Sequence, residues 1–151
     1  MTRFVPDTSC LVAAVCSWHE HHEATAEELA RRSKRREKMV MAAPALVEAY
    51  AVLTRLPPPY RLRPQDALAV MVGSWGEVEV VAMSGAETWP FLRALPGSGI
   101  AGGNSYDAHV AACARKAKAG VILTWNVRDF ERVAEGVEVA SPGEPHSTKR
   151  P

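Results

Sequence analysis

The sequence is poor in cysteine, and this absence excludes two common ways of stabilising a small protein. Its 151 residues include only three cysteines, irregularly spaced and without a C-x-x-C pair: Cys10, Cys16 and Cys113. A disulfide scaffold or a structural zinc site would need more ligands than these residues supply. Free thiols of this kind are typical of a reducing compartment, so we expect a cytoplasmic protein.

An excess of one charge and a long apolar run are also absent. Lysine plus arginine number 18 and aspartate plus glutamate 17, a formal net charge of +1. Contact with nucleic acid would therefore need a local patch. The longest early apolar run, Leu11 to Cys16, is too short to span a membrane, and no charged leader or cleavage site accompanies it. We expect no membrane contact and no signal peptide.

The composition that is present is that of a folded domain. Hydrophobic residues make up 47% of the chain and charged residues 23%, as in ordinary globular proteins. A chain of 151 residues suits one compact domain. The last residues are rich in proline and polar side chains. We predict one domain over residues 1–140, followed by a flexible C-terminal tail over residues 141–151.

Short apolar segments alternate along the chain with helical patterns. Strands are predicted at 2–5, 39–42, 78–83, 121–124 and 137–140, and helices at 11–18, 20–38, 45–56, 65–75, 86–95 and 105–118. Thr8 or Ser9 is expected to cap the first helix. The buried stripe of the third helix is expected to hold Leu46, Val47, Tyr50 and Leu53. The alternation and the apolar strands predict an α/β fold with a mostly parallel sheet covered on both faces.

Four acidic residues occupy equivalent places relative to these elements. Each follows a strand directly or lies near the start of a helix: Asp7, Glu48, Asp107 and Asp129. Ligands of parallel α/β proteins collect at the carboxyl edge of the sheet, so all four acids can lie on one side of it. Each acid alone could be a helix cap or a solvent-facing charge. Four acids at one edge favour a functional site.

A cluster of acids places limits on its own chemistry. Neighbouring carboxylates raise one another's pKa, so they remain anions together only with a cation among them. An all-oxygen set of ligands favours Mg²⁺ or Mn²⁺ over zinc. Such an ion can activate water in line with a phosphodiester and stabilise the leaving oxygen. The residues therefore predict a metal-dependent phosphodiesterase.

Four motifs carry a resemblance to a known family. They are FVPDTS at 4–9, APALVEAY at 43–50, GGNSYDAH at 102–109 and LTWNVRDF at 123–130. In this order they resemble the motifs of the PIN-domain ribonucleases, most closely the VapC-type toxins of bacterial toxin–antitoxin pairs. The sequence departs from the family at Pro6, where an aliphatic residue is usual, and this proline removes one donor from the end of the first strand.

The resemblance implies a three-layer α/β/α sandwich and cleavage of RNA that depends on Mg²⁺ or Mn²⁺. The acids of the family that bind the metal match Asp7, Glu48, Asp107 and Asp129 of this sequence. Thr124 and Asn126 match the polar companions of the family near the metal, which orient carboxylates or water. The resemblance also implies a homodimer and a cognate antitoxin that blocks the site. The leading hypothesis is therefore an endoribonuclease toxin.

Other functions remain open at this point. A housekeeping RNA-processing nuclease of the same fold would carry the same residues. A phosphatase could use Asp7 as its nucleophile, although no second acid lies two positions further on. A non-catalytic interaction module would keep the acids only as helix caps. RNA cleavage, a trapped aspartyl-phosphate and the absence of metal binding, respectively, would distinguish the nuclease, the phosphatase and the interaction module.

Three further features are interpreted as structural. The HEHHE run at 19–23 lacks the H-E-x-x-H spacing and is expected to be the polar start of the second helix. The basic run at 31–38 is expected to be a solvated helix end. Trp125 lies between two candidate site residues, but tryptophan more often lies in a core or an interface.

Overall fold

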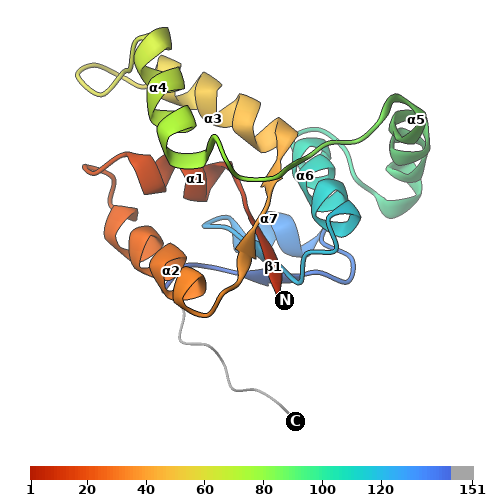
Figure 1. Ribbon diagram of the computed structural model, residues 1–151. Coiled ribbons are helices and arrows are strands. Elements are labelled where there is room, and N and C mark those ends of the chain that lie inside the picture. The colour runs from red at the N-terminus through yellow and green to blue at the C-terminus, as the bar shows by residue number, and fades with distance from the viewer. Residues whose placement is uncertain (144–151) are drawn as a thin grey trace.

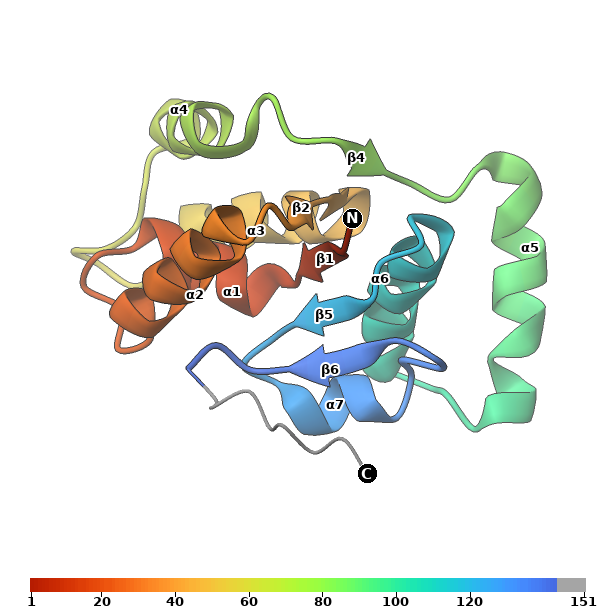
Figure 2. The same ribbon diagram turned by 60° about the horizontal axis from the view of Figure 1, so that its bottom comes forward.

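A four-stranded parallel sheet forms the centre of the computed structural model, which describes residues 1–143. Its strand order is β2-β1-β5-β6, and Figure 2 shows the strands side by side in this order. The strands are β2 (Lys38–Met39), β1 (Arg3–Pro6), β5 (Val121–Leu123) and β6 (Glu138–Ala140). A second, two-stranded parallel sheet pairs β3 (Met41–Ala42) with β4 (Val80–Val81). The tail predicted at 141–151 lies outside the described residues from 144 onward.

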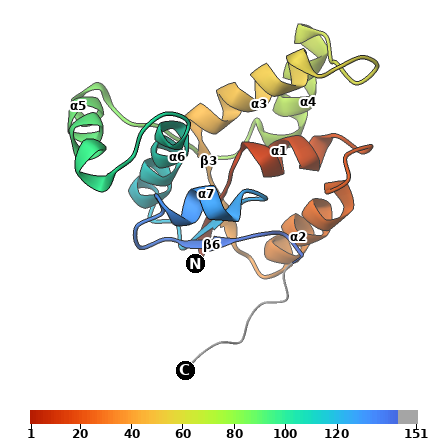
Figure 3. The same cartoon turned by 180° about the vertical axis from the view of Figure 1, so that it is seen from behind.

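The connections between the strands are mostly helical. The helices are α1 (Thr8–Val15), α2 (His22–Lys34), α3 (Ala43–Arg55), α4 (Pro64–Trp75), α5 (Gly85–Ala94), α6 (Asn104–Lys116) and α7 (Val127–Glu131), with a 3₁₀ turn η1 (Pro96–Ser98). Figures 1 and 3 show α5 at the edge of the molecule beyond α6, on the opposite side from α2. None of the helices in residues 1–143 has the length and hydropathy that crossing a bilayer requires.

Alternate residues of β1 belong to different layers. Phe4 packs in a buried cluster with Leu29 of α2, whereas Val5 packs in the main core with Ala49 of α3 and Ala111 of α6. Successive side chains of a strand point to opposite faces of its sheet, so α2 covers one face and α3 and α6 cover the other. The predicted α/β fold with a central parallel sheet between helical layers is therefore confirmed.

The single strand predicted at 39–42 is wrong, because this run serves two sheets. The backbone N–H of Val40 donates to the carbonyl of Phe4 at 2.9 Å, which ties the run to β1. The next N–H, of Met41, donates to the carbonyl of Glu79 at 2.8 Å in the second sheet. The strand predicted at 78–83 shortens for a related reason, since only Val80–Val81 pairs with β3.

Helix starts and faces also differ from the predictions. Asp7, rather than Thr8 or Ser9, caps α1, and its side chain accepts from the N–H of Cys10 at 3.1 Å. The buried face of α3 consists of Ala45, Ala49 and Leu53, while Val47 of the predicted stripe is 70% exposed. Small residues four apart allow α1 to approach α3 closely, and the larger side chains of α3 then face outward.

Candidate functional site

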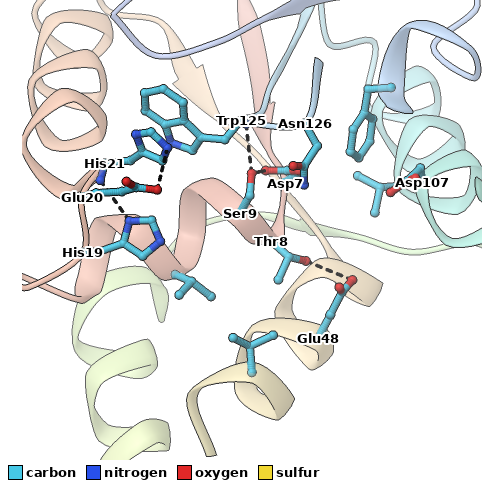
Figure 4. Close-up of a pocket in the computed structure, with 14 residues that line it drawn as sticks. Asp7, Thr8, Ser9, His19, Glu20, His21, Glu48, Asp107, Trp125 and Asn126 are labelled. Atoms are coloured by element: carbon cyan, nitrogen blue, oxygen red, sulfur yellow. Dashed lines mark hydrogen bonds and ion pairs between the residues drawn. The ribbon is translucent and has the colours of Figure 1, made fainter. Parts of the chain in front are cut away.

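A cleft of about 420 Å³ opens where β1 and β5 end (Figure 4). The register pairs Pro6 with Leu123, and the N–H of Asp7 donates to the carbonyl of Leu123 at 2.9 Å. The proline therefore leaves the end of the strand paired, and the residues that follow the two strands, Asp7 and Thr124, become neighbours. Helices α1, α3 and α6 supply the other walls of the cleft through Thr8, Glu48 and Asp107.

Asp7 lies at the centre of the site and is almost fully buried. Both of its oxygens are held: Ser9 Oγ donates to Oδ1 at 2.6 Å, and Thr124 Oγ1 donates to Oδ2 at 2.6 Å. Burial raises the pKa of Asp7 above its usual value, and hydrogen bonds from Ser9, Thr124 and Cys10 act in the opposite direction. The carboxyl group is fixed in one orientation before anything binds.

The pKa of Asp107 depends on the negative charges of the other acids in the site. It lies in the first turn of α6 and is half-buried. Burial and then the negative charges of three other acids raise the pKa of Asp107 to about 6; these acids are Asp129, Asp7 and Glu48. A shift of this kind requires the acids to lie within electrostatic reach of one another. The structure therefore brings the four predicted acids together around Asp107.

The outer two acids are less enclosed. Glu48 is exposed on α3, and Thr8 Oγ1 donates to its Oε2 at 3.2 Å, which joins α1 to α3 beside the cleft. Asp129 is exposed in the first turn of α7 and does not line the cleft, although its charge acts on Asp107. Asp7 and Asp107 thus form the inner part of the cluster, and Glu48 and Asp129 the outer part.

The two polar companions occupy different places. Thr124 is fully buried behind Asp7, where its hydroxyl donates to Asp7 and accepts from the N–H of Asn126 at 2.9 Å. Asn126 lines the cleft itself. Thr124 therefore positions Asp7 and the Asn126 backbone, whereas the side chain of Asn126 can reach a ligand.

The site fits a hard divalent cation held by few protein ligands. Within residues 1–143, no three acid, histidine or cysteine side chains are close enough to form a complete metal cage. None of the described residues that line the cleft is lysine or arginine, so its carboxylates have no cationic side chain among them. Mg²⁺ is usually held by one or two carboxylates, with water and substrate phosphate completing its shell. The open acidic cleft matches that pattern better than it matches a zinc cage.

Sequence analysis missed one wall of the cleft. His19, Glu20 and His21 line it, although the sequence predicted only the polar start of a helix there. Helix α2 begins at His22, and the preceding turn carries these side chains on the side of Asp7 away from Asp107 (Figure 4). Trp125 lies in the same wall and stacks on His21, with ring centroids 3.8 Å apart. Only the position of Trp125 between two candidate residues hinted at this wall.

Comparison with known sequences identifies related proteins along nearly the whole chain. A family model described as PIN domain matches residues 4–136. Ribonuclease VapC40 of Mycobacterium tuberculosis is 35% identical over 139 residues, which cover 90% of this chain and 98% of that protein. Ribonuclease VapC27 of the same bacterium is 33% identical over 138 residues, covering 89% of this chain and 95% of that protein.

Solved structures share the architecture at lower sequence identity. VapBC2 from Rickettsia felis, bound to a DNA fragment, matches with a TM-score of 0.68 at 16% identity, over 93% of this chain and 98% of that chain. DNA-bound VapBC from Salmonella typhimurium matches with a TM-score of 0.65 at 23% identity, over the same shares of the two chains. VapC20 of Mycobacterium tuberculosis, described as a sarcin-ricin loop cleaving toxin, matches with a TM-score of 0.62 at 17% identity, over 79% and 86%. These structures confirm the fold.

Proposed function

The chain belongs to the PIN domain family, among whose members it resembles the VapC ribonucleases, and we propose that it is an endoribonuclease that needs Mg²⁺ or Mn²⁺. The observation that carries this proposal is the acidic cleft at the carboxyl ends of β1 and β5. Burial and then the charges of the other acids raise the pKa of Asp107 to about 6, and no lysine or arginine among the described lining residues offsets those charges.

The roles of the acids follow from their burial and their partners. Asp7 and Asp107 are the proposed inner ligands of the metal, and Glu48 and Asp129 are proposed to act at longer range or through water. A bound divalent cation supplies activation of water and neutralisation of charge at the scissile phosphate. No residue of the chain needs to form a covalent bond with the substrate.

The polar residues hold this arrangement in place. Ser9 and Thr124 each donate a 2.6 Å hydrogen bond to Asp7, so the carboxylate does not need to reorganise when its ligand arrives. Asn126, with its side chain in the cleft, is proposed to orient water or a phosphate oxygen. The site residues are thus Asp7, Glu48, Asp107, Asp129, Asn126 and Thr124.

The biological setting that we propose is a toxin–antitoxin pair acting in the cytoplasm. Structural neighbours are VapBC complexes, which supports a cognate antitoxin as a partner. Leu11 and Val12 of α1 are buried in the structure and offer no surface to a partner segment. The outward face of α3 stays available: Val47 and Tyr106 line a groove of about 590 Å³ beside Glu48, which an antitoxin segment or a second copy of the chain could fill.

Cleavage of RNA tests the proposal. The wild-type protein, Asp7→Asn and Asp107→Asn are incubated with RNA in Mg²⁺, in Mn²⁺ and in EDTA. Cleavage by the wild type alone, and only with metal, is expected. Full activity in both variants would refute the site. A stable fold with no calorimetric binding of Mg²⁺ or Mn²⁺ would favour an interaction module. Co-expression with the adjacent reading frame tests the antitoxin separately, since a housekeeping nuclease would form no such complex.

A further inference from the structure

A series of aromatic and imidazole rings leads from the acidic cleft to the surface. From the inside outward, the rings belong to Trp125, His21, His19, Trp18 and Tyr60. Successive ring centroids lie 3.8, 5.6, 5.8 and 4.2 Å apart. The rings come from three separate parts of the chain: the segment after β5, the turn between α1 and α2, and the turn between α3 and α4. We refer to these five rings as the ring track.

Hydrogen bonds connect the inner end of the ring track to Asp7, one of the two proposed inner ligands of the metal. The N–H of Trp125 donates to Ser9 Oγ at 3.0 Å, and the same Ser9 hydroxyl donates to Asp7 at 2.6 Å. Trp125 Nε1 donates to Thr25 Oγ1 at 3.0 Å, and Thr25 Oγ1 in turn donates to the carbonyl of His21 at 2.7 Å. Buried Thr25 therefore fixes Trp125 and the backbone of His21 relative to each other, next to Asp7.

The outer end of the track is open to solvent. Trp18 and Tyr60 stack at an interplanar angle of 25°, yet each residue is 44% exposed. Two large aromatic residues held against each other at the surface add less to the core than buried ones do, since nearly half of the surface of each stays in contact with water. The exposed part of each residue is available to a flat ligand.

The chemistry of the rim favours a base over a phosphate. Glu20 points into the same region and lies 3.5 Å from His21 Nε2, so this rim carries a negative side chain. Burial and then the neighbouring His21 lower the pKa of His19, which favours the uncharged form of its ring. The rings of Trp18 and Tyr60 carry no charge, so beside the Glu20 carboxylate they attract phosphate poorly. They can still stack on nucleobases, each of which has a π-face.

We propose that Trp18, Tyr60 and His19 stack on unpaired nucleobases of the RNA strand that enters the cleft and thereby select single-stranded or looped RNA. This inference rests on the proposed ribonuclease function. In a regular duplex the base faces are already stacked on one another, and only splayed bases offer a face to aromatic side chains. Because Ser9 connects the inner end of the track to Asp7, a strand whose bases lie along the track leads its phosphates toward the acids.

Binding of RNA by matched tryptophan variants tests the ring track. In an Asp107→Asn background with Mg²⁺, the anisotropy of a labelled single-stranded RNA of mixed sequence gives the Kd for each protein. Trp18→Ala and Tyr60→Ala are each expected to weaken binding about 5- to 150-fold, the range measured for loss of one base–aromatic stack. The control is Trp89→Ala on α5, which removes a 65% exposed tryptophan away from the cleft and is expected to leave Kd unchanged.

The RNA itself supplies a second control. An RNA of the same length whose central positions lack bases offers phosphates but no rings. Trp18→Ala is expected to bind this abasic RNA with the same Kd as the parent protein. The two proteins are also expected to share the same Kd for duplex RNA. Trp18→Phe and Tyr60→Phe keep a ring and are expected to restore binding of the single strand, which distinguishes stacking from damage to the fold.

Kinetics on the active chain distinguish recognition from catalysis. With Asp107 intact, Trp18→Ala is expected to raise KM for single-stranded RNA with little change in kcat. Equal affinities for Trp18→Ala and Trp89→Ala, or equal losses on abasic and complete RNA, would overturn the ring track while leaving the nuclease in place. Absence of any RNA cleavage by the wild-type protein would instead refute the proposed function.

Discussion

Two charged clusters in this protein differ in their balance of charge and in the consequence of that balance. On α2, the guanidinium of Arg32 is buried between two carboxylates, with Nε 2.8 Å from Glu28 and a terminal nitrogen 3.2 Å from Glu37. Arg31 contacts Glu28 as well. At the carboxyl edge of the sheet, by contrast, Asp7 and Asp107 face other carboxylates, and no lysine or arginine is among the described residues that line the cleft.

The difference separates a structural cluster from a functional one. The Arg32 guanidinium also lies over the ring of Phe4, 5.2 Å from its centroid, so the balanced cluster holds α2 against the sheet. Among the described residues that line the cleft, no lysine or arginine compensates the acids in this way. Their mutual repulsion makes the metal-free site electrostatically unfavourable, and a cation from solution would relieve it. The balanced charges around Arg32 therefore help to hold α2 in place, whereas the unbalanced charges of the cleft favour the binding of a cation.

Removing an inner acid should have the largest effect on function. Asp7→Asn and Asp107→Asn are each expected to lower RNA cleavage about 10³-fold, because several kcal/mol of metal-dependent transition-state stabilisation are lost. Asparagine can still cap α1, so the fold should survive. Asp66→Asn, the same exchange on α4, is the matched control and should keep full activity. Comparable rates for Asp66→Asn and Asp107→Asn would remove the distinction between the two clusters.

Removing Arg32 from the balanced cluster should lower the stability of the fold rather than the catalytic activity. Arg32→Ala leaves the buried Glu28 with less positive charge around it, and we expect the free energy of unfolding to fall by about 3 kcal/mol. Urea denaturation measures this change. Arg35→Ala, an exposed neighbour at the end of α2, should change stability by less than about 0.5 kcal/mol. If both variants were equally stable, the Arg32 cluster would be only a solvated helix end.

The hydrogen bonds to Asp7 allow the comparison to be sharpened. Thr124→Val removes the 2.6 Å donor to Asp7 Oδ2 while keeping the shape of the side chain. Loss of such an orienting partner typically lowers metal affinity about 10- to 100-fold. Calorimetric titration with Mn²⁺ measures the effect, and Thr124→Ser, which retains the hydroxyl, should bind like the wild type. An unchanged affinity in Thr124→Val would show that Asp7 does not need this donor.

The smallest expected effect concerns pH. The pKa of Asp107 is raised in the folded protein from 3.8 to about 6, so the folded state holds its proton more tightly than the unfolded state does between these values. The ionised carboxylate therefore opposes folding above about pH 6, and this cost disappears as the pH falls toward 4.

Asp107→Asn should accordingly raise the Tm of the metal-free protein at pH 8. The rise should not exceed about 4 °C, because Asp107 is only half-buried and solvent screens the repulsion. At pH 4 most of this difference should disappear, since Asp107 is then protonated in the folded state and only partly ionised in the unfolded state. Thermal unfolding in EDTA at the two pH values measures the difference. A lower Tm for the variant at pH 8 would show that repulsion between Asp107 and the other acids does not destabilise the metal-free fold.

Much of the architecture could be predicted from local patterns. The alternation of apolar strands with helices indicated the parallel sheet. The motif around Asp7 indicated at which edge of the sheet the acids would lie. The failures involve long-range pairing. Nothing in the run at 39–42 shows that Val40 hydrogen-bonds to β1 and Met41 to the segment before β4. Of the predicted stripe on α3, Leu53 is buried but Val47 and Tyr50 are exposed, because helix periodicity gives a stripe but not which neighbour will cover it.

The functional site also has a part that could be predicted from the sequence and a part that could not. The sequence by itself determined the chemistry of the acids, because carboxylates that follow parallel strands can meet only at one edge of the sheet. Only the tertiary structure decided what surrounds them. Three turns far apart along the chain bring Tyr60, Trp18 and Trp125 into one series of rings, and buried Thr25 holds its inner end. Side-chain stacking depends on the packing of several helices at once, and no spacing within a single segment encodes it.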